Sequence, residues 1–220
     1  IPGIVATIRH YQIGASIGYD KDRDGKYKFI TAIVIGVDPE EEVQVLDTLE
    51  YMTSGQFIDA NDTEGIVLAA GLAGGTELPL EDLGGAKVGD KVQVTYPNGI
   101  IKRYTVRGIY DIKFGAAALT ALISAREAEA VLSAHNSATQ ILAKIDERNY
   151  SIDTITERVR NMYPALKVQK YMELFETIKT FLQAFDIISY IVSAISVIVA
   201  TVTLFVLIYV NAISRKRQIG

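Results

Sequence analysis

The sequence predicts an α+β fold that is followed by a long apolar helix. Three observations support this prediction: polar and apolar residues alternate over residues 88–110, helical spacing recurs in two later segments, and residues 187–210 contain no charged side chain. In the second half, the expected order of strand, helix, strand, helix and strand corresponds to a split βαβ arrangement. The apolar stretch is the most informative of the three, because a transmembrane helix and its flanking charges would determine on which side of the membrane the preceding residues lie.

The apolar stretch from Ile187 to Val210 has the length of a transmembrane helix. It contains about 24 residues, and a helix that rises about 1.5 Å per residue would cross a hydrocarbon core with that length. Tyr190 and Tyr209 lie near its two ends, where amphipathic rings prefer the headgroup region. A buried core helix is the alternative, but such helices rarely stay apolar on every face for more than about 18 residues. We therefore predict a transmembrane helix at 187–210.

A basic tail, residues 211–220, follows this helix and predicts its orientation. Arg215, Lys216 and Arg217 form a cytoplasmic anchor, because clustered basic residues resist translocation. The expected location is the cell membrane, with residues 1–186 extracytoplasmic. The chain begins Ile1-Pro2-Gly3 without an initiator Met or a signal sequence, so we expect an earlier segment, a first transmembrane helix, to precede it.

Composition excludes several classes of partner and chemistry. Three of the 22 Lys and Arg residues lie in the tail, which leaves 19 basic against 26 acidic residues, a net charge of −7, before it. Nucleic acid is not an expected partner for such a surface. The sequence contains no Cys, so disulfides, thiol chemistry and Cys-based metal sites are excluded, and no cofactor is expected.

The first predicted strands are Ile13–Tyr19 and Tyr27–Val37, which are rich in β-branched and aromatic residues. The polar segment DKDRDG between them is typical of a hairpin turn. It also matches the start of a calcium-binding EF-hand loop, with acids at Asp20, Asp22 and Asp24. Thr31 occupies the position at which that loop needs a bidentate Glu, so a solvated hairpin tip is favoured over a weak cation site.

The middle of the chain predicts one short helix, several strands and a loop. The segment 37–49 begins with acidic residues that suit a helix N-terminus and then places Val43, Leu46 and Leu49 at helical spacing. Further predictions are a buried strand at Gly65–Ala69, a glycine-rich loop at Gly71–Gly85, and two strands within 88–110 joined by a turn at Pro97-Asn98-Gly99.

The second half supplies the remaining strands and helices. Strands are predicted at Leu119–Ile123, Thr139–Ile145 and Ala165–Gln169. The segment from Ser124 to Glu127 has the pattern of a capping box, which leads into a helix near Leu132. A second helix begins near Thr154 and places Ile155, Val159 and Met162 on one face.

The last helix is expected to begin before the membrane, as a stalk over residues 171–186. Large residues at alternating spacings of four and three indicate an apolar seam that faces another helix, and the seam continues inside the span with small residues. Chance remains the alternative, since Ser and Ala are common in spans. The helix-packing seam consists of Tyr171, Phe175, Ile178, Leu182, Phe185, Ser189, Ser193, Ser196, Ala200 and Thr203.

The sequence contains no motif that predicts an active site. His10 and His135, the two histidines, match no metal-ligand or nucleophile motif and are interpreted as ordinary surface or strand residues. The acidic clusters at 38–42 and 81–82 fit a solvated face or helix capping better than paired-carboxylate catalysis. No phosphate-binding Gly-Lys-Ser/Thr ending occurs, so the chain should not hydrolyse nucleotides itself. We predict that it is not an enzyme and has no catalytic, cofactor or metal residues.

Several stretches together resemble the permease subunits of FtsX/MacB-type ABC transporters. They are VIGVDPEEE at 34–42, GIVL at 65–68, KVGDKVQVTYPNGIIKRYTVRGIYD at 87–111, ISAREAEAVL at 123–132, and the span followed by NAISRKRQIG. The resemblance implies a porter-like α+β subdomain formed by residues 1–36 and 114–170, and an inserted small β-rich subdomain at 37–113. The glycine-rich loop at 71–85 departs from the tighter helix-to-strand joint of the family.

The resemblance also implies a function. In that family a cytoplasmic ABC ATPase drives two permease copies, and the movement passes through the spans to the outer domains in export, lipoprotein release or control of an envelope process. The implied partners are the ATPase subunit, a second permease copy, and an extracytoplasmic protein or lipid-linked substrate. The alternative is a single-span membrane-anchored recognition or adhesion domain without an ATPase. A membrane-anchored hydrolase would need a catalytic cluster that this sequence does not contain.

Overall fold

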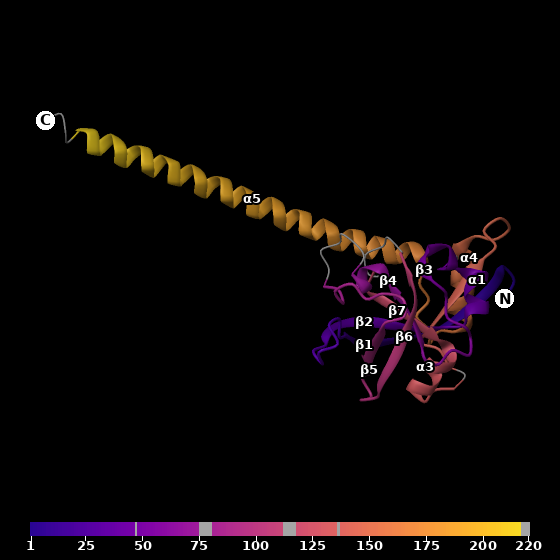
Figure 1. Ribbon diagram of the computed structural model, residues 1–220. Helices are drawn as coiled ribbons and strands as arrows, with labels where there is room; N and C mark the ends of the chain where they lie inside the picture. Colours follow the sequence, from indigo (N-terminus) through magenta and orange to yellow (C-terminus); the bar gives the residue numbers. More distant parts are fainter. Residues whose placement is uncertain (47, 75–80, 112–117, 136, 217–220) are drawn as a thin grey trace. The chain divides into compact units, whose positions relative to one another are not determined.

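The computed structural model describes residues 1–46, 48–74, 81–111, 118–135 and 137–216 (Figure 1). The chain divides into two compact units, Ile1–Tyr150 and Ser151–Gly220. The strands are β1 Ile4–Tyr19, β2 Lys28–Val37, β3 Met52–Gly55, β4 Gly65–Ala69, β5 Lys91–Thr95, β6 Ile101–Tyr110, β7 Thr120–Ser124 and β8 Gln140–Ile145. The helices are α1 Pro39–Val45, the 3-10 helix η1 Thr48–Tyr51, α2 Ala70–Ala73, α3 Ala125–Leu132, α4 Ile152–Met162 and α5 Tyr171–Lys216.

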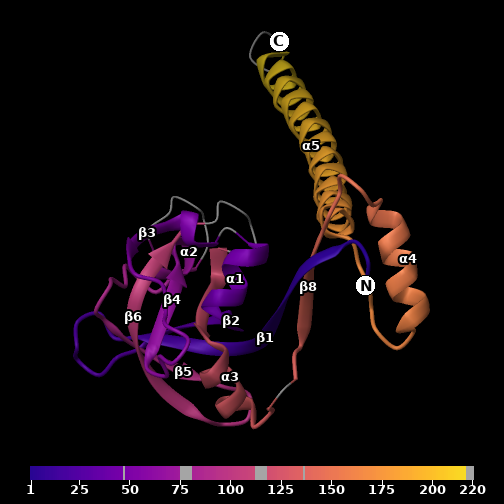
Figure 2. The same ribbon diagram turned by 90° about the vertical axis from the view of Figure 1, so that its right-hand side faces the viewer.

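Six strands of the first unit close into a ring. The order β2-β7-β4-β6-β5-β1 closes because β1 also pairs with β2, and β3 and β8 are attached outside this path. The β2–β7 and β4–β6 pairs are parallel, whereas the other four pairs are antiparallel. Closure satisfies backbone groups that would otherwise lie at an open sheet edge. We call this closed sheet the strand ring (Figure 2).

The long strand β1 belongs to the strand ring and also to a second ribbon. Residues from Tyr11 onward pair with β2, whereas residues 4–10 pair with β8. Even-numbered side chains are the more buried ones up to His10, and odd-numbered ones are buried from Tyr11 onward. Because successive side chains of a strand alternate between faces, the two halves of β1 present opposite faces to their cores. β1 thus joins the ring to the β1–β8 ribbon.

Most of the predicted strands are confirmed. Composition predicted the hairpin β1–β2, alternation predicted the pair β5–β6, and short apolar runs predicted the buried strand β4; the strands β7 and β8 also lie where they were expected. The α+β fold class is confirmed as well, since a large mixed sheet carries helices in the connections. The capping box is half formed: the Glu127 N–H donates to Ser124 Oγ at 3.3 Å, while the Glu127 side chain binds elsewhere.

The helix predicted over 37–49 is shorter than expected. α1 ends at Val45, and the apolar residues Val43, Leu46 and Leu49 are exposed. The buried side chain of α1 is Glu42, so the acidic residue and not the apolar spacing decides which face packs inward. The start of the helix is as expected, because Asp38 accepts hydrogen bonds from the backbone N–H groups of Glu40 and Glu41.

Two further predictions need correction. The strand predicted at Ala165–Gln169 is wrong, because these residues adopt turn, bend and irregular backbone, and Arg160 Nη2 donates to the Val168 carbonyl at 3.0 Å. Periodicity alone does not supply a pairing partner. The expected loop at Gly71–Gly85 begins inside the short helix α2, and its residues 75–80 lie outside the described part of the chain.

The expected subdomain boundaries do not coincide with a break in the sheet. β2 and β7 lie outside the proposed insert 37–113, yet β7 pairs with β4 inside it, and all three belong to the strand ring. Helices α4 and α5 fall in the second unit. The division into a porter-like subdomain, residues 1–36 with 114–170, and an inserted β-rich subdomain, residues 37–113, stays a prediction.

The packing of α3 depends on a glycine in β2. A Cβ atom built on Gly36 would lie 2.2 Å from the Cβ of Ala128 in α3, a distance that packed atoms do not tolerate. Ala128 is fully buried, so neither the helix nor the strand has space to move apart without opening the core.

We expect Gly36→Ala to destabilise the first unit by about 1–3 kcal/mol, because overpacking at this contact displaces α3. The matched control is Gly14→Ala, in the adjacent strand β1, where an added Cβ would meet nothing within 4 Å. That variant should be neutral or more stable by up to about 1 kcal/mol, since alanine restricts the unfolded chain. Urea unfolding of both variants is the measurement, and equal stabilities would contradict the steric explanation.

Candidate functional site

Helix α5 contains the candidate site that the sequence predicted. It runs from Tyr171 to Lys216 without interruption (Figure 1). Its 46 residues correspond to a length of about 69 Å. The segment Ile188–Val210 is long and apolar enough to cross a membrane, and none of it is buried against other parts of the chain. The predicted stalk and span are therefore one continuous helix.

The predicted helix-packing seam lies along α5, and its two parts differ in what is described. The small residues of the span are exposed, and the hydroxyls of Ser196 and Thr203 donate to the carbonyls of Val192 and Val199, each at 2.8 Å. These bonds satisfy the hydroxyls within the helix, which suits an apolar surrounding. The side chains of Tyr171, Phe175, Ile178, Leu182 and Phe185 lie outside the described part, so a packed seam stays a prediction.

The cytoplasmic anchor also stays a prediction. The backbone of Arg215 and Lys216 forms the last turn of α5, but their side chains are outside the description, and Arg217 lies outside the described residues altogether. Basic residues at a helix C-terminus are favourable for the helix dipole whatever their role in topology.

His10 forms a buried polar cluster that joins β1 to α1. Its Nε2 atom lies 2.8 Å from Glu42 Oε2, and Thr48 Oγ1 donates to Glu42 Oε1 at 2.9 Å. All three residues are buried. The interpretation of His10 as a strand histidine fits its place in β1, but its burial with a carboxylate was not predicted, because the two residues are distant in sequence. The contacts occupy both carboxylate oxygens, which favours a structural role.

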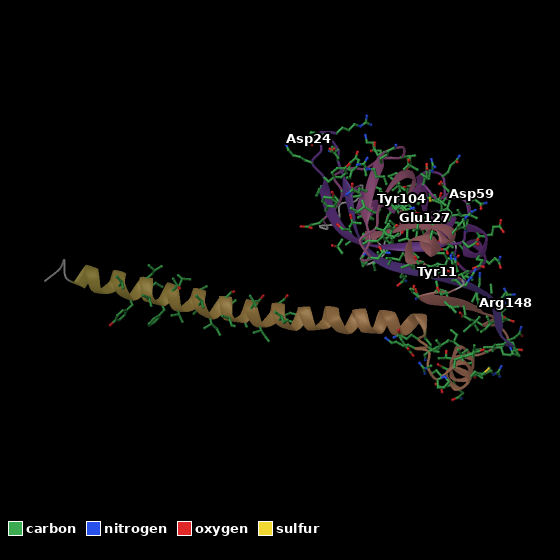
Figure 3. All side chains as sticks on the ribbon, turned by 90° about the horizontal axis from the view of Figure 1, so that it is seen from below. Tyr11, Asp24, Asp59, Tyr104, Glu127 and Arg148 are labelled. Carbon is green, nitrogen blue, oxygen red and sulfur yellow. The ribbon has the colours of Figure 1, made fainter. Side chains whose placement is uncertain are left out.

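A second buried cluster fastens α3 to the strand ring. Glu127 Oε1 accepts a hydrogen bond from the Tyr104 hydroxyl at 2.9 Å and lies 2.9 Å from Lys102 Nζ. The hydroxyls of Tyr96 and Tyr104 are 2.8 Å apart, and Figure 3 shows Tyr104 and Glu127 side by side. Burial of such groups is tolerated when each has a partner, and no buried side-chain atom in the described residues lacks one.

Burial raises the pKa of Tyr11, Tyr19, Tyr96 and Tyr110 from 10.0 to about 12 and raises that of Tyr104 as well. The folded state therefore favours the neutral hydroxyl. The resulting stability is complete below pH 10 and is lost as the pH rises through 12. Each such tyrosine lowers the unfolding free energy by up to about 1.4 kcal/mol per pH unit in that window.

We expect Tyr19→Phe to reduce this alkaline slope, because the variant loses a titrating hydroxyl that donates to Asp90 at 2.7 Å. Urea unfolding of the full chain in detergent over an alkaline pH series measures the slope. Tyr150→Phe, at an exposed tyrosine, is the control and should leave the slope unchanged. An unfolding free energy that stays constant through pH 12 would contradict the expectation.

The hairpin tip uses its carboxylates to hold its own backbone. Asp20 accepts hydrogen bonds from the N–H groups of Asp24 and Gly25 at 3.2 and 2.8 Å, and Asp24 accepts one from Lys26 at 2.9 Å. Among the described residues no group of three His, Cys, Asp or Glu residues could hold a metal ion. These contacts are those of a hairpin turn, and calorimetric titration with calcium tests the alternative of a weak cation site.

Comparisons with known proteins identify the fold as that of extracytoplasmic transporter domains. No family model matches the sequence, and no curated protein matches it. The structure resembles the extracellular domain of YknZ, a noncanonical ABC-type transporter from Gram-positive bacteria, with TM-score 0.50 and 13% identity over 77% of this chain and 83% of that one.

A second similar structure is the periplasmic region of MacB from Actinobacillus actinomycetemcomitans. The TM-score is 0.50 and the identity 13%, over 81% of this chain and 78% of that one. Both comparisons show the fold, and they confirm at this level the resemblance that the sequence indicated. A fold hosts many functions, so the role of the chain has to be argued from its own residues.

Proposed function

We propose that the chain is the extracytoplasmic domain and second span of a permease subunit in an ABC transporter of the FtsX/MacB type. The observation that carries the proposal is the continuity of α5, which begins after the short connecting segment 163–170 that follows α4 and extends through the 23-residue apolar segment Ile188–Val210. A helix without proline or glycine over this length is stiff enough to transmit displacement.

In the proposed mechanism, a cytoplasmic ABC ATPase subunit closes on nucleotide and displaces the inner end of α5. The basic residues Arg215, Lys216 and Arg217 meet that subunit, and a second permease copy packs along the helix-packing seam. The outer domain moves in response and acts on an extracytoplasmic protein or a lipid-linked substrate. The chain itself supplies movement and binding, not catalysis, and it needs no cofactor.

Topology tests the membrane part of this proposal. The chain has no Cys, so single cysteines can be introduced without background labelling. In intact cells, a membrane-impermeant maleimide should label Lys21→Cys at the exposed hairpin tip, and should label Ser214→Cys only after the membrane is permeabilised. Labelling of Ser214→Cys alone in intact cells would overturn the proposed orientation.

Complex formation tests the transporter part. The full-length protein should co-purify with an ATPase subunit that carries a phosphate-binding loop, and its outer domain should change conformation when ATP is added. A protein that stays alone, with an outer domain that does not respond to ATP, would instead be the membrane-anchored recognition domain named above.

A further inference from the structure

The start of α5 is tied to α4 through charged side chains. Lys170, the residue before α5, directs its Nζ atom to Asp153 Oδ1 at 2.7 Å, and Asp153 lies in the first turn of α4. The backbone N–H of Lys170 donates to Glu173 Oε2 at 3.3 Å, so Glu173 caps the first turn of α5. Lys170 Nζ also lies 3.8 Å from Glu173 Oε1. One lysine therefore links both helices.

Arg160, in the last turn of α4, makes the second link. Its Nη1 atom donates to Glu157 at 3.0 Å within α4, and its Nη2 atom donates to the carbonyl of Val168 at 3.0 Å in the connecting segment. Nη2 also lies 3.7 Å from Glu173 Oε1. A planar guanidinium with several donors is suited to hold three groups at once. Arg160 thus touches α4, the connecting segment and α5.

These contacts form a connected network that we call the helix clamp. On α4 its members are spaced by four and three residues, which places them on one side of the helix. Lys170 lowers the pKa of the Asp153 carboxyl, and Asp153 raises the pKa of the Lys170 amine, so both partners favour the charged pair. The clamp consists of Asp153, Glu157, Arg160, Lys170 and Glu173.

The helix clamp spans the connecting segment 163–170, which has no helix or strand of its own. Without the clamp, this segment would be the natural place for a hinge between α4 and α5. Isolated exposed ion pairs contribute little, but a network that shares two cations restricts orientation more than single pairs do. Residues 151–220 also form one compact unit that excludes β8.

We propose that α4 is a positioning element that moves with α5 as one piece. Displacement of α5 then reaches the first unit through the junction between Tyr150 and Ser151, and the connecting segment 163–170 does not act as the hinge. The transmission of this displacement during transport rests on the proposed function, whereas the rigidity of the α4–α5 piece does not depend on it.

Distances between spin labels on α4 and α5 test the proposal in the full chain, reconstituted in lipid without nucleotide or partner. The labelled positions are Asn161→Cys and Ile188→Cys, both exposed. The expected result is one narrow distance distribution. Combining Arg160→Ala with Lys170→Ala should remove the narrow peak, whereas Lys167→Ala, an exposed basic residue of the same segment, should keep it.

Charge exchange separates the clamp from a general loss of folding. Asp153→Lys alone should broaden the distribution, and adding Lys170→Asp should restore the narrow peak. A label pair at Lys21 and Arg103 within the first unit should stay unchanged in every variant, which shows that the strand ring is folded. A broad distribution in the unmodified chain, or a narrow one without the clamp, would overturn the proposal.

The rigid α4–α5 piece and the proposed transporter role can fail independently of each other. A broad α4–α5 distribution would leave the proposed transporter role intact and move the hinge to residues 163–170. A narrow distribution in a protein whose outer domain ignores ATP would keep the rigid piece and remove the transporter role.

Discussion

Inserting two glycines between Ile178 and Lys179 is expected to abolish ATP-driven movement of the outer domain while ATP hydrolysis continues. Each glycine is less favourable in a helix than alanine by about 1 kcal/mol, so the pair creates a weak point between the clamp and the membrane. Two added residues also rotate the two parts of α5 by about 200° relative to each other, which breaks the phase of the predicted seam. Labels on the outer domain, followed during ATP turnover by the full-length complex, measure the movement.

Two control insertions distinguish the loss of stiffness in α5 from the rotation of its predicted seam. Two alanines at the same position keep the helix stiff but cause the same rotation, whereas seven alanines keep the helix stiff and nearly restore the phase. Movement that survives both alanine insertions and fails only with glycines assigns the effect to stiffness. Unchanged movement in the glycine variant would refute α5 as a transmitting element.

Replacing Glu42 by Ala is expected to lower the unfolding free energy by about 3 kcal/mol, because it leaves the buried side chains of His10 and Thr48 without their shared hydrogen-bond partner. Both oxygens of Glu42 are in use, one with His10 at 2.8 Å and one with Thr48 at 2.9 Å, and the side chain is 4% exposed. The lost free energy is that of the buried contacts that hold α1 against β1. Urea unfolding followed by circular dichroism measures it.

The neighbouring residue provides a matched control on the same two elements. Glu41 pairs with Arg9 at 3.6 Å, and these side chains are 34% and 42% exposed. Glu41→Ala should therefore cost less than about 1 kcal/mol, since solvent screens an exposed pair. Similar losses in the two variants would show that burial does not set the strength of these contacts.

Sequence patterns predicted the parts of the fold whose information is local. Alternation predicted the strands on both sides of the turn at 97–99, because each strand has one buried face, and β-branched and aromatic composition predicted those on both sides of the turn at 20–25. The span could be predicted because apolar runs of this length are rare in helices other than transmembrane helices. The first residues of β1 were missed, since the strand changes its buried face between His10 and Tyr11 and a single period does not cover both halves.

The contacts that were missed join residues distant in sequence. Closure of the strand ring needs β1 to pair with β5 as well as with its hairpin partner β2, and the local pattern of β1 does not indicate the pairing with β5. The burial of Glu42 and Glu127 was hidden because acidic residues near a helix start are usually capping or solvated. The sequence contains one indication of the helix clamp, because Asp153, Glu157 and Arg160 recur at helical spacing. Their partners could not be predicted, because these lie beyond an irregular segment.

β1 pairs both within the strand ring and with β8, and this sets the order in which its strand pairs can form during synthesis. β1 precedes its partner strands in the sequence. Ile17 can pair with Val94, and Ile8 with Leu142, only after those later residues have been synthesised. Contacts of such long sequence separation fold slowly, because the intervening chain must be ordered before they form. A pause in synthesis before residue 140 would leave residues 4–10 of β1 without their partner strand, and unpaired strand edges of this kind favour aggregation until the chain is complete.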